Sequence, residues 1–88
     1  MTSLTLNAEP IAQSVETSDS DLVVRLTDGR VLSAPLVWFP RLHNATPAKR
    51  MAYELMGNGM GIHWPELDED ISVVGLLAGR PSIEYRAK

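Results

Sequence analysis

The sequence contains no cysteine, so it can form neither a disulfide framework nor a thiolate metal site. No stretch approaches the roughly 18 apolar residues of a membrane-spanning helix, and the first residues lack the basic and apolar regions of a signal peptide. Positive charge is also scarce, because 8 Lys and Arg stand against 11 Asp and Glu. A dense basic surface for phosphate contacts is therefore not expected. We expect a cytoplasmic protein that does not bind nucleic acid on its own and does not enter a membrane.

The residues that are present describe a small globular domain. The 88 residues are 44% hydrophobic and 22% charged, which is typical of a folded chain and allows one modest core. We expect a flexible lead-in over residues 1–10, a single domain over 11–81, and a tail or edge strand over 82–88.

Alternating side chains predict a small antiparallel sheet of about three strands. The β-branched residues of 11–17 favour a first strand, and the aliphatic alternation of Leu22–Thr27 predicts a second. Asp28-Gly29 is typical of a two-residue type I′ turn that leads into a third strand. Such a turn places Val31 opposite Leu26, with both side chains on the core face.

Two short helices are expected to pack on one face of this sheet. Thr46-Pro47 is typical of a helix start. An apolar stripe at helical spacing then runs as far as Met56, and Gly57 ends the helix. Ser72 caps a second helix that stops at Gly79. The expected fold class is therefore α+β.

A glycine-rich stretch joins the two expected helices. Gly57, Gly59 and Gly61 resemble a phosphate-binding loop, but they follow a helix, and no Lys-Ser or Lys-Thr pair comes after them. A helix end with a tight turn explains them better. We expect the stretch to be a connector between helices.

No pattern of residues indicates a catalytic, cofactor or metal site. The spacing of His43 and His63 matches no common set of metal ligands. The run of carboxylates after Pro65 lacks the alternating oxygen donors of a calcium loop, and no nucleophile elbow is present. The stretch from Gly59 to Asp70 is nevertheless aromatic and acidic, which suits protein recognition. The candidate interaction surface consists of Gly59, His63, Trp64, Glu66, Asp68 and Asp70.

Several short segments together resemble one bacterial family, the domain-of-unknown-function family numbered twenty-four forty-two. The resemblance covers Leu22 to Pro81. It is carried by Asp28-Gly29, Pro40-Arg41-Leu42, Ala45-Thr46, Gly61-Ile62-His63-Trp64-Pro65, Leu67-Asp68-Glu69-Asp70-Ile71 and Leu76-Leu77-Ala78-Gly79.

The resemblance implies a bacterial, cytoplasmic α+β protein of unknown function, with no established catalytic or cofactor residues. Family members look like stand-alone small proteins or the first part of a longer chain with a helix-turn-helix. Many look like the antitoxin of a toxin–antitoxin pair. Since little sequence follows Gly79 here, we expect no helix-turn-helix and no direct DNA binding of that kind.

The leading hypothesis is a non-catalytic, antitoxin-like module that masks a small partner protein. A small-molecule sensor or minor enzyme that uses His63 with Glu66 or Asp68 is an alternative, and a DNA-binding regulator is another. The sequence is also compatible with a homodimer.

Overall fold

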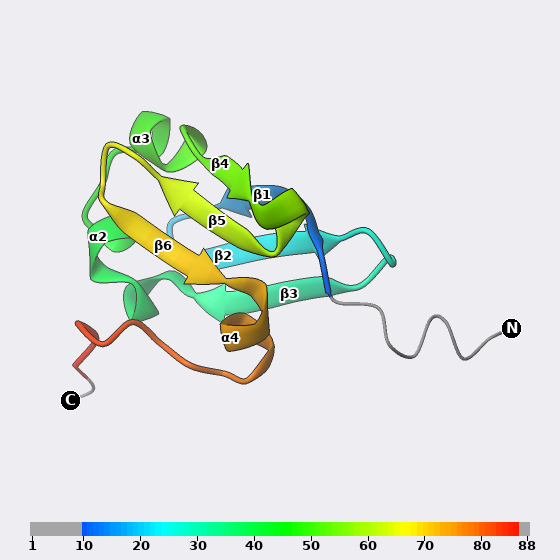
Figure 1. Cartoon of the computed structure of the whole chain (residues 1–88). Coiled ribbons are helices and arrows are strands. Elements are labelled where there is room, and N and C mark those ends of the chain that lie inside the picture. Colours follow the sequence, from blue (N-terminus) through cyan, green and yellow to red (C-terminus); the bar gives the residue numbers. More distant parts are fainter. Residues whose placement is uncertain (1–9, 87–88) are drawn as a thin grey trace, which may run out of the picture.

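The computed structural model describes residues 10–86, which form two three-stranded antiparallel sheets with short helices around them (Figure 1). The expected small α+β fold is confirmed. The predicted lead-in lies outside the described residues, apart from Pro10. None of the helices in the described part of the chain is long and apolar enough to cross a membrane.

Sheet A contains the strands expected from the alternating pattern. Its strands are β1 (Ala12–Thr17), β2 (Asp21–Leu26) and β3 (Val31–Pro35), in the order β1-β2-β3. Leu22 and Val24, on the predicted core face of β2, are fully buried. The period-2 distribution of aliphatic side chains therefore sets which face of the sheet covers the core.

The turn between β2 and β3 differs from the prediction by one residue of register. Arg25 lies opposite Val31, so Val31 points outward and is 51% exposed. A type I′ turn needs positive φ at both central residues, whereas only Gly29 has it (φ 97°). Asp28 instead accepts a hydrogen bond from the Arg30 N–H at 3.0 Å, which stabilises a longer loop. The predicted turn type and the predicted burial of Val31 were wrong.

Sheet B occupies the stretch that was expected to end one helix and connect it to another. Its strands are β4 (Glu54–Met56), β5 (Gly61–Trp64) and β6 (Glu69–Ser72), in the order β4-β5-β6. A single 3-10 turn, η2 (Gly57–Gly59), joins β4 to β5. The glycines therefore shape a β-hairpin rather than a helix end, and the predicted helix-to-helix connector was wrong.

Helix α3 (Pro47–Met51) is about half as long as predicted. The start is confirmed, since the Thr46 hydroxyl accepts the Lys49 N–H at 3.3 Å. The predicted burial of the apolar stripe is wrong, because Met51 is 76% exposed while Arg50 is buried. The inward face of this helix is the one that carries the arginine.

Tyr53 explains why the helix stops early. Its hydroxyl accepts the Val15 N–H of β1 at 3.1 Å, and its ring packs against Trp64 at 6.3 Å between centroids. A continued helix would carry Tyr53 away from both contacts. Tertiary packing therefore overrides the helical spacing of the next apolar residues.

Three further short helices complete the fold: η1 (Leu36–Trp38), α2 (Pro40–His43) and α4 (Val73–Leu77). The start of α4 was predicted correctly, because the Ser72 hydroxyl accepts the Gly75 N–H at 2.9 Å. The two sheets and these helices enclose one core. The most completely buried large side chains are Trp64, Leu22, Leu26, Leu36, Leu42, Ile62, Val24 and Val73.

Candidate interaction site

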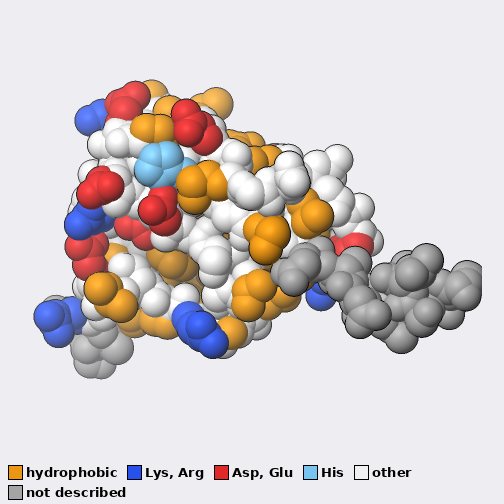
Figure 2. All heavy atoms as spheres, in the orientation of Figure 1, with side chains coloured by type: hydrophobic (Ala, Val, Ile, Leu, Met, Phe, Trp, Pro, Cys, Tyr) orange, Lys and Arg blue, Asp and Glu red, His pale blue; other side chains and the backbone are white. Residues whose placement is uncertain are grey.

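The outer face of sheet B is the first part of the site. Along β5 and β6 the side chains alternate, so that Ile62, Trp64 and Ile71 are buried, whereas His63 and Asp70 point outward. No described helix or strand lies over this face (Figure 1). Figure 2 shows acidic, apolar and histidine side chains gathered on it. The outer face of sheet B comprises Glu54, Met56, Gly61, His63, Asp70 and Ser72.

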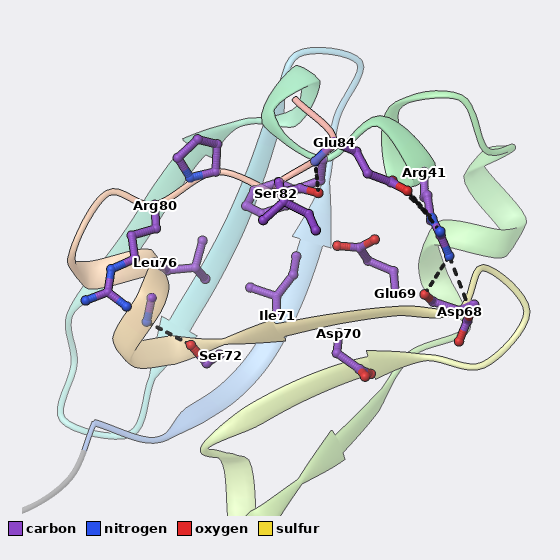
Figure 3. A pocket seen from close by; sticks show the side chains of 14 residues that line it. Arg41, Asp68, Glu69, Asp70, Ile71, Ser72, Leu76, Arg80, Ser82 and Glu84 are labelled. Carbon is purple, nitrogen blue, oxygen red and sulfur yellow. Dashed lines mark hydrogen bonds and ion pairs between the residues drawn. The ribbon is translucent and has the colours of Figure 1, made fainter. Parts of the chain in front are cut away.

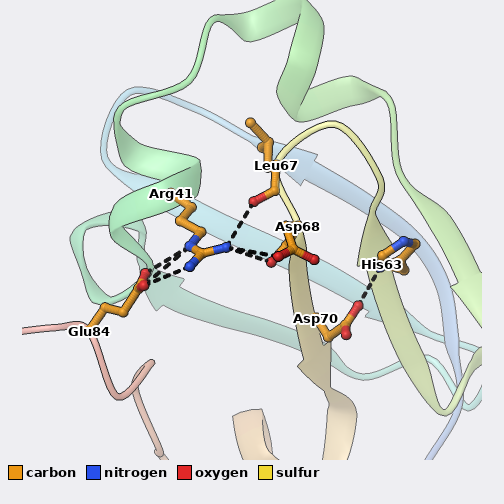
Figure 4. Close-up of polar contacts among 6 residues, drawn as sticks. All are labelled: Arg41, His63, Leu67, Asp68, Asp70 and Glu84. Carbon is orange, nitrogen blue, oxygen red and sulfur yellow. Dashed lines mark hydrogen bonds and ion pairs between the residues drawn. The ribbon is translucent and has the colours of Figure 1, made fainter.

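His63 and Asp70 are in hydrogen-bond contact across the strands of this face. They lie directly opposite each other in the β5–β6 register, and His63 Nδ1 contacts Asp70 Oδ1 (Figure 4). Glu54 occupies the equivalent position on β4, on the other side of His63. The structure therefore pairs the histidine with Asp70 rather than with Glu66 or Asp68.

Apolar side chains lie beside the charged row. Met56 and Met60 are 39% and 46% exposed, and Val74 at the start of α4 is half exposed. A Cβ added to Gly61 would lie 3.6 Å from the Met56 methyl group, so the methionine covers the surface that the glycine leaves open. Flexible methionine side chains are common at protein-binding surfaces.

Two residues of the predicted surface are buried instead. Trp64 is fully buried, and its indole Nε1–H donates to the Arg50 carbonyl oxygen at 2.9 Å. Gly59 has a φ of 98°, and a Cβ there would lie 2.5 Å from a methyl group of Ile11. Inward placement follows from strand alternation for the tryptophan and from close packing for the glycine. Both belong to the structural frame of the site.

The turn between β5 and β6 carries the acidic residues that sequence reasoning placed on the surface. Glu66 and Asp68 are exposed there, and Asp68 adopts a left-handed backbone with φ of 52°. Aspartate tolerates this conformation better than most residues. The turn therefore places Glu66 and Asp68 at the end of the β5–β6 hairpin that carries the paired His63 and Asp70.

Arg41 of α2 ties this turn to the C-terminal segment. Its Nη1–H donates to the Asp68 carbonyl oxygen at 2.9 Å, while Nε and Nη2 donate to the Glu84 carboxylate at 3.0 and 2.9 Å (Figure 4). The guanidinium hydrogen bonds hold the pKa of Glu84 below its usual value. The forked geometry is the one in which arginine binds carboxylates most specifically.

An open groove lies between β6, α4 and the C-terminal segment, with a volume of about 450 Å³ (Figure 3). We call it the acidic groove. Four carboxylates and two arginines contribute charge to its lining, and its apolar lining comes from Phe39, β6, α4 and the C-terminal segment. The lining includes Arg41, Asp68, Glu69, Asp70, Ile71, Leu76, Arg80, Ser82 and Glu84.

Glu69 is the functional candidate that sequence reasoning missed. It lies opposite Trp64 on the inner face of sheet B and is only 8% exposed. Burial raises the pKa of the Glu69 carboxyl, and the neighbouring Glu84 charge raises it further. In the sequence, Glu69 alternates with Ile71 and Val73, which indicates that its side chain points inward. The alternation is hard to recognise because Glu69 lies within a run of carboxylates.

Within residues 10–86, no three His, Asp or Glu side chains gather closely enough to hold a metal ion. Of the two histidines considered as ligands, His63 contacts Asp70 instead. His63 is not among the residues that line the acidic groove.

These observations define a small α+β protein with an exposed acidic sheet face and an acidic groove beside it. The chain belongs to a family of proteins of unknown function, DUF2442, whose model matches residues 12–82. The resemblance noted in the sequence is thereby confirmed. No curated protein matches the sequence.

Two solved structures share this fold. A protein of unknown function from Rhodospirillum rubrum is 30% identical, with a TM-score of 0.75 over 88% of this chain and 95% of that one. An uncharacterised protein from Chromobacterium violaceum is 28% identical, with a TM-score of 0.70 over 84% of this chain and 70% of the other. Both support the architecture, and neither carries a stated function.

Proposed function

We propose that this chain is a non-catalytic protein-interaction module of the bacterial cytoplasm that masks a small partner protein, in the manner of an antitoxin. The observation that carries the proposal is the outer face of sheet B, an uncovered sheet face with a charged row beside exposed methionines. Sheet faces that pack on nothing are normally polar, so exposed apolar side chains beside charges favour recognition.

Charge selects the kind of partner. Glu54 and Asp70 lie on this face and Glu66 and Asp68 in the adjoining turn. Arg41, which contacts that turn, is already bound by carboxylates. A partner surface that presents basic side chains around an apolar centre is therefore complementary. Like charges at an interface are unfavourable, so this match favours a different protein over a second copy of the chain.

A homodimer through the same face is disfavoured on symmetry grounds. A two-fold interface brings each residue near its own copy or a neighbour's, so Glu54 and Asp70 would meet like charges. Sedimentation equilibrium of the purified chain is expected to give a monomer. If the chain forms a stable dimer that dissociates on Asp70→Lys, the partner of this face is a second copy of the chain instead of a different protein.

Affinity capture from lysate of the native host tests the proposal. The tagged chain is compared with the double variant Glu54→Lys/Asp70→Lys, and with Glu16→Lys on β1 as a control of sheet A. The wild type and the Glu16 variant are expected to retain one small protein at equal stoichiometry, and the double variant to lose it. No stoichiometric partner, or equal recovery by all three proteins, would contradict the proposal.

A small-molecule function has one observation in its favour, the pairing of His63 with Asp70. A carboxylate that holds a histidine ring in place is the arrangement a general base uses. The pair lies on an open sheet face rather than in the groove, which suits recognition better than chemistry. If His63→Ala leaves every ligand-induced thermal shift unchanged, this alternative is excluded.

A further inference from the structure

The acidic groove is bordered by Glu69, a largely buried residue whose carboxyl group takes part in no ion pair within the described part of the chain. Glu69 is 8% exposed, and the ion pairs found within residues 10–86 do not include it. Figure 3 shows its side chain directed into the groove, toward the segment that contains Ser82 and Glu84. No side-chain oxygen of the described residues is both fully buried and without a hydrogen-bond partner. The Glu69 carboxylate is therefore only partly desolvated, and a counter-charge in the groove would offset that cost.

No cation in the described part of the chain forms an ion pair with Glu69, although the Arg41 charge partly opposes the rise of the Glu69 pKa. Arg41 is held by the Glu84 carboxylate at 2.9 Å and by the Asp68 carbonyl oxygen at 2.9 Å. Arg80 lines the opposite end of the groove, beside Leu76 (Figure 3). The space in front of Glu69 is therefore acidic, hollow and open to solvent.

We propose that the acidic groove binds the cationic head of an arginine or lysine side chain presented by the partner protein, with Glu69 as its counter-ion. This inference rests on the proposed function and specifies the chemistry of the contact. Ile71, Leu76 and Phe39 supply apolar lining for the aliphatic stem of such a side chain. The volume of about 450 Å³ lies within the range of about 300–1,000 Å³ that is usual for ligand pockets.

The groove is continuous with the outer face of sheet B, because Asp70 and Ser72 belong to both. A basic side chain at the border of the partner's surface can enter the groove while the rest of that surface covers the sheet. Desolvated charge pairs of this kind are among the contacts that dominate binding energy.

The test titrates the full chain with single amino acids that are blocked at both ends. N-acetyl-arginine N-methylamide and its lysine counterpart are titrated while backbone amide signals and the Glu69 side-chain carboxyl ¹³C signal are followed by NMR. The citrulline derivative is the uncharged control for the arginine probe. Glu69→Gln removes the counter-ion, and Glu16→Gln, on β1 outside the groove, is the matched control for the loss of one carboxylate.

The charged probes are expected to shift the signals of Glu69, Ile71 and Ser82, and to lower the pH at which the Glu69 carboxyl titrates. Glu69→Gln is expected to weaken this binding by about tenfold, while Glu16→Gln binds as the wild type does. Equal shifts with the citrulline probe, shifts spread over the whole surface, or unchanged binding by Glu69→Gln would overturn the inference.

Failure of this inference and failure of the proposed function give different results. Absence of probe binding, together with a captured partner that is lost on charge reversal of sheet B, overturns the groove contact alone. Probe binding without any captured partner overturns the proposed function, and with it the protein source of the cationic group. The groove would then be a site for a free guanidinium compound or amine.

Discussion

The indole Nε1–H of Trp64 donates a hydrogen bond to the carbonyl oxygen of Arg50 at 2.9 Å, and the Arg50 side chain donates in turn to the carbonyl oxygens of Leu42 and His43 at 2.9 and 3.0 Å. One buried residue therefore connects α3 to β5 through its backbone and to α2 through its guanidinium. Because β5 also carries His63 outward, this link helps to hold the outer face of sheet B in place.

Replacing Arg50 by methionine is expected to destabilise the protein by about 2–4 kcal/mol. Methionine can replace the aliphatic part of Arg50, but the Leu42 and His43 carbonyl oxygens lose the guanidinium hydrogen bonds, and in the described part of the chain only Leu42 keeps another donor, the Ala45 N–H at 3.1 Å. Urea denaturation followed by tryptophan fluorescence measures the change. Arg25→Met on the exposed face of β2 is the matched control, with an expected effect of less than about 0.5 kcal/mol. Equal effects of the two substitutions would show that the link is unimportant.

Gly59→Ala is expected to cost about 2–4 kcal/mol of stability, because a Cβ there meets an Ile11 methyl carbon at 2.5 Å and the Ala12 carbonyl oxygen at 2.7 Å. Gly29→Ala is the control for backbone strain alone. Gly29 has almost the same φ, 97° against 98°, but nothing lies within 4 Å of its added Cβ. A cost of about 1 kcal/mol is expected there. If the thermal unfolding of both variants shifts equally, close packing does not determine the choice of glycine at position 59.

Glu69→Gln is expected to stabilise the free protein at neutral pH by a few tenths of a kcal/mol, since solvent in the open groove screens part of the charge. The folded state raises the pKa of the Glu69 carboxyl, so it binds the proton more tightly than the unfolded chain does. Stability contributed by the neutral carboxyl is present below the unfolded pKa and is lost as pH rises through the folded pKa.

The stability difference between Glu69→Gln and the wild type should therefore develop as pH rises above about 4.5, the ordinary glutamate value. Denaturation midpoints measured from pH 3.5 to 7.5 check this. A difference that is constant over the whole range would mean that the ionisation of Glu69 has no part in it.

Asp70→Asn separates stability from recognition on the outer face of sheet B. The pair with His63 is exposed on the Asp70 side, where the side chain is 65% accessible. Its loss should cost less than about 1 kcal/mol of stability. Affinity for the captured partner is expected to fall by about tenfold or more, measured by calorimetry with the purified partner. A large loss of stability with unchanged affinity would assign Asp70 a structural role.

The strands of sheet A could be predicted from the sequence because period-2 alternation of aliphatic residues determines which face is buried. The register could not, since it depends on how the Asp28 side chain binds the Arg30 N–H. That contact favours a longer loop over the type I′ turn. The error of one residue moved Val31 from the predicted core to the surface.

Sheet B was missed because Met51, Leu55 and Met56 fit helical spacing as well as they fit a turn followed by a strand. The choice is made by Tyr53, whose contacts with Val15 and Trp64 come from distant parts of the chain. Local pattern cannot report such contacts. The N-cap residues Thr46 and Ser72, in contrast, were predicted correctly because capping is a local interaction. The predicted helix end at Gly57 was wrong, since that residue begins the turn between β4 and β5.

The candidate site was predicted in part. The positions of His63, Asp68 and Asp70 on one exposed edge follow from the sequence stretch itself. The pairing of His63 with Asp70 and the burial of Glu69 require the antiparallel β5–β6 register, which was not recognised. Once that register is known, alternation places Trp64 and Glu69 inward together.

The amide hydrogen-exchange footprint of the captured complex tests the central claim most directly. Exchange of the free chain is compared with that of the chain bound to its partner. The account predicts slowed exchange over 54–72, which contains β4 to β6, and little change over 21–35 in β2 and β3. Protection confined to sheet A, or no protection in either sheet, would contradict the claim that the outer face of sheet B is the recognition surface.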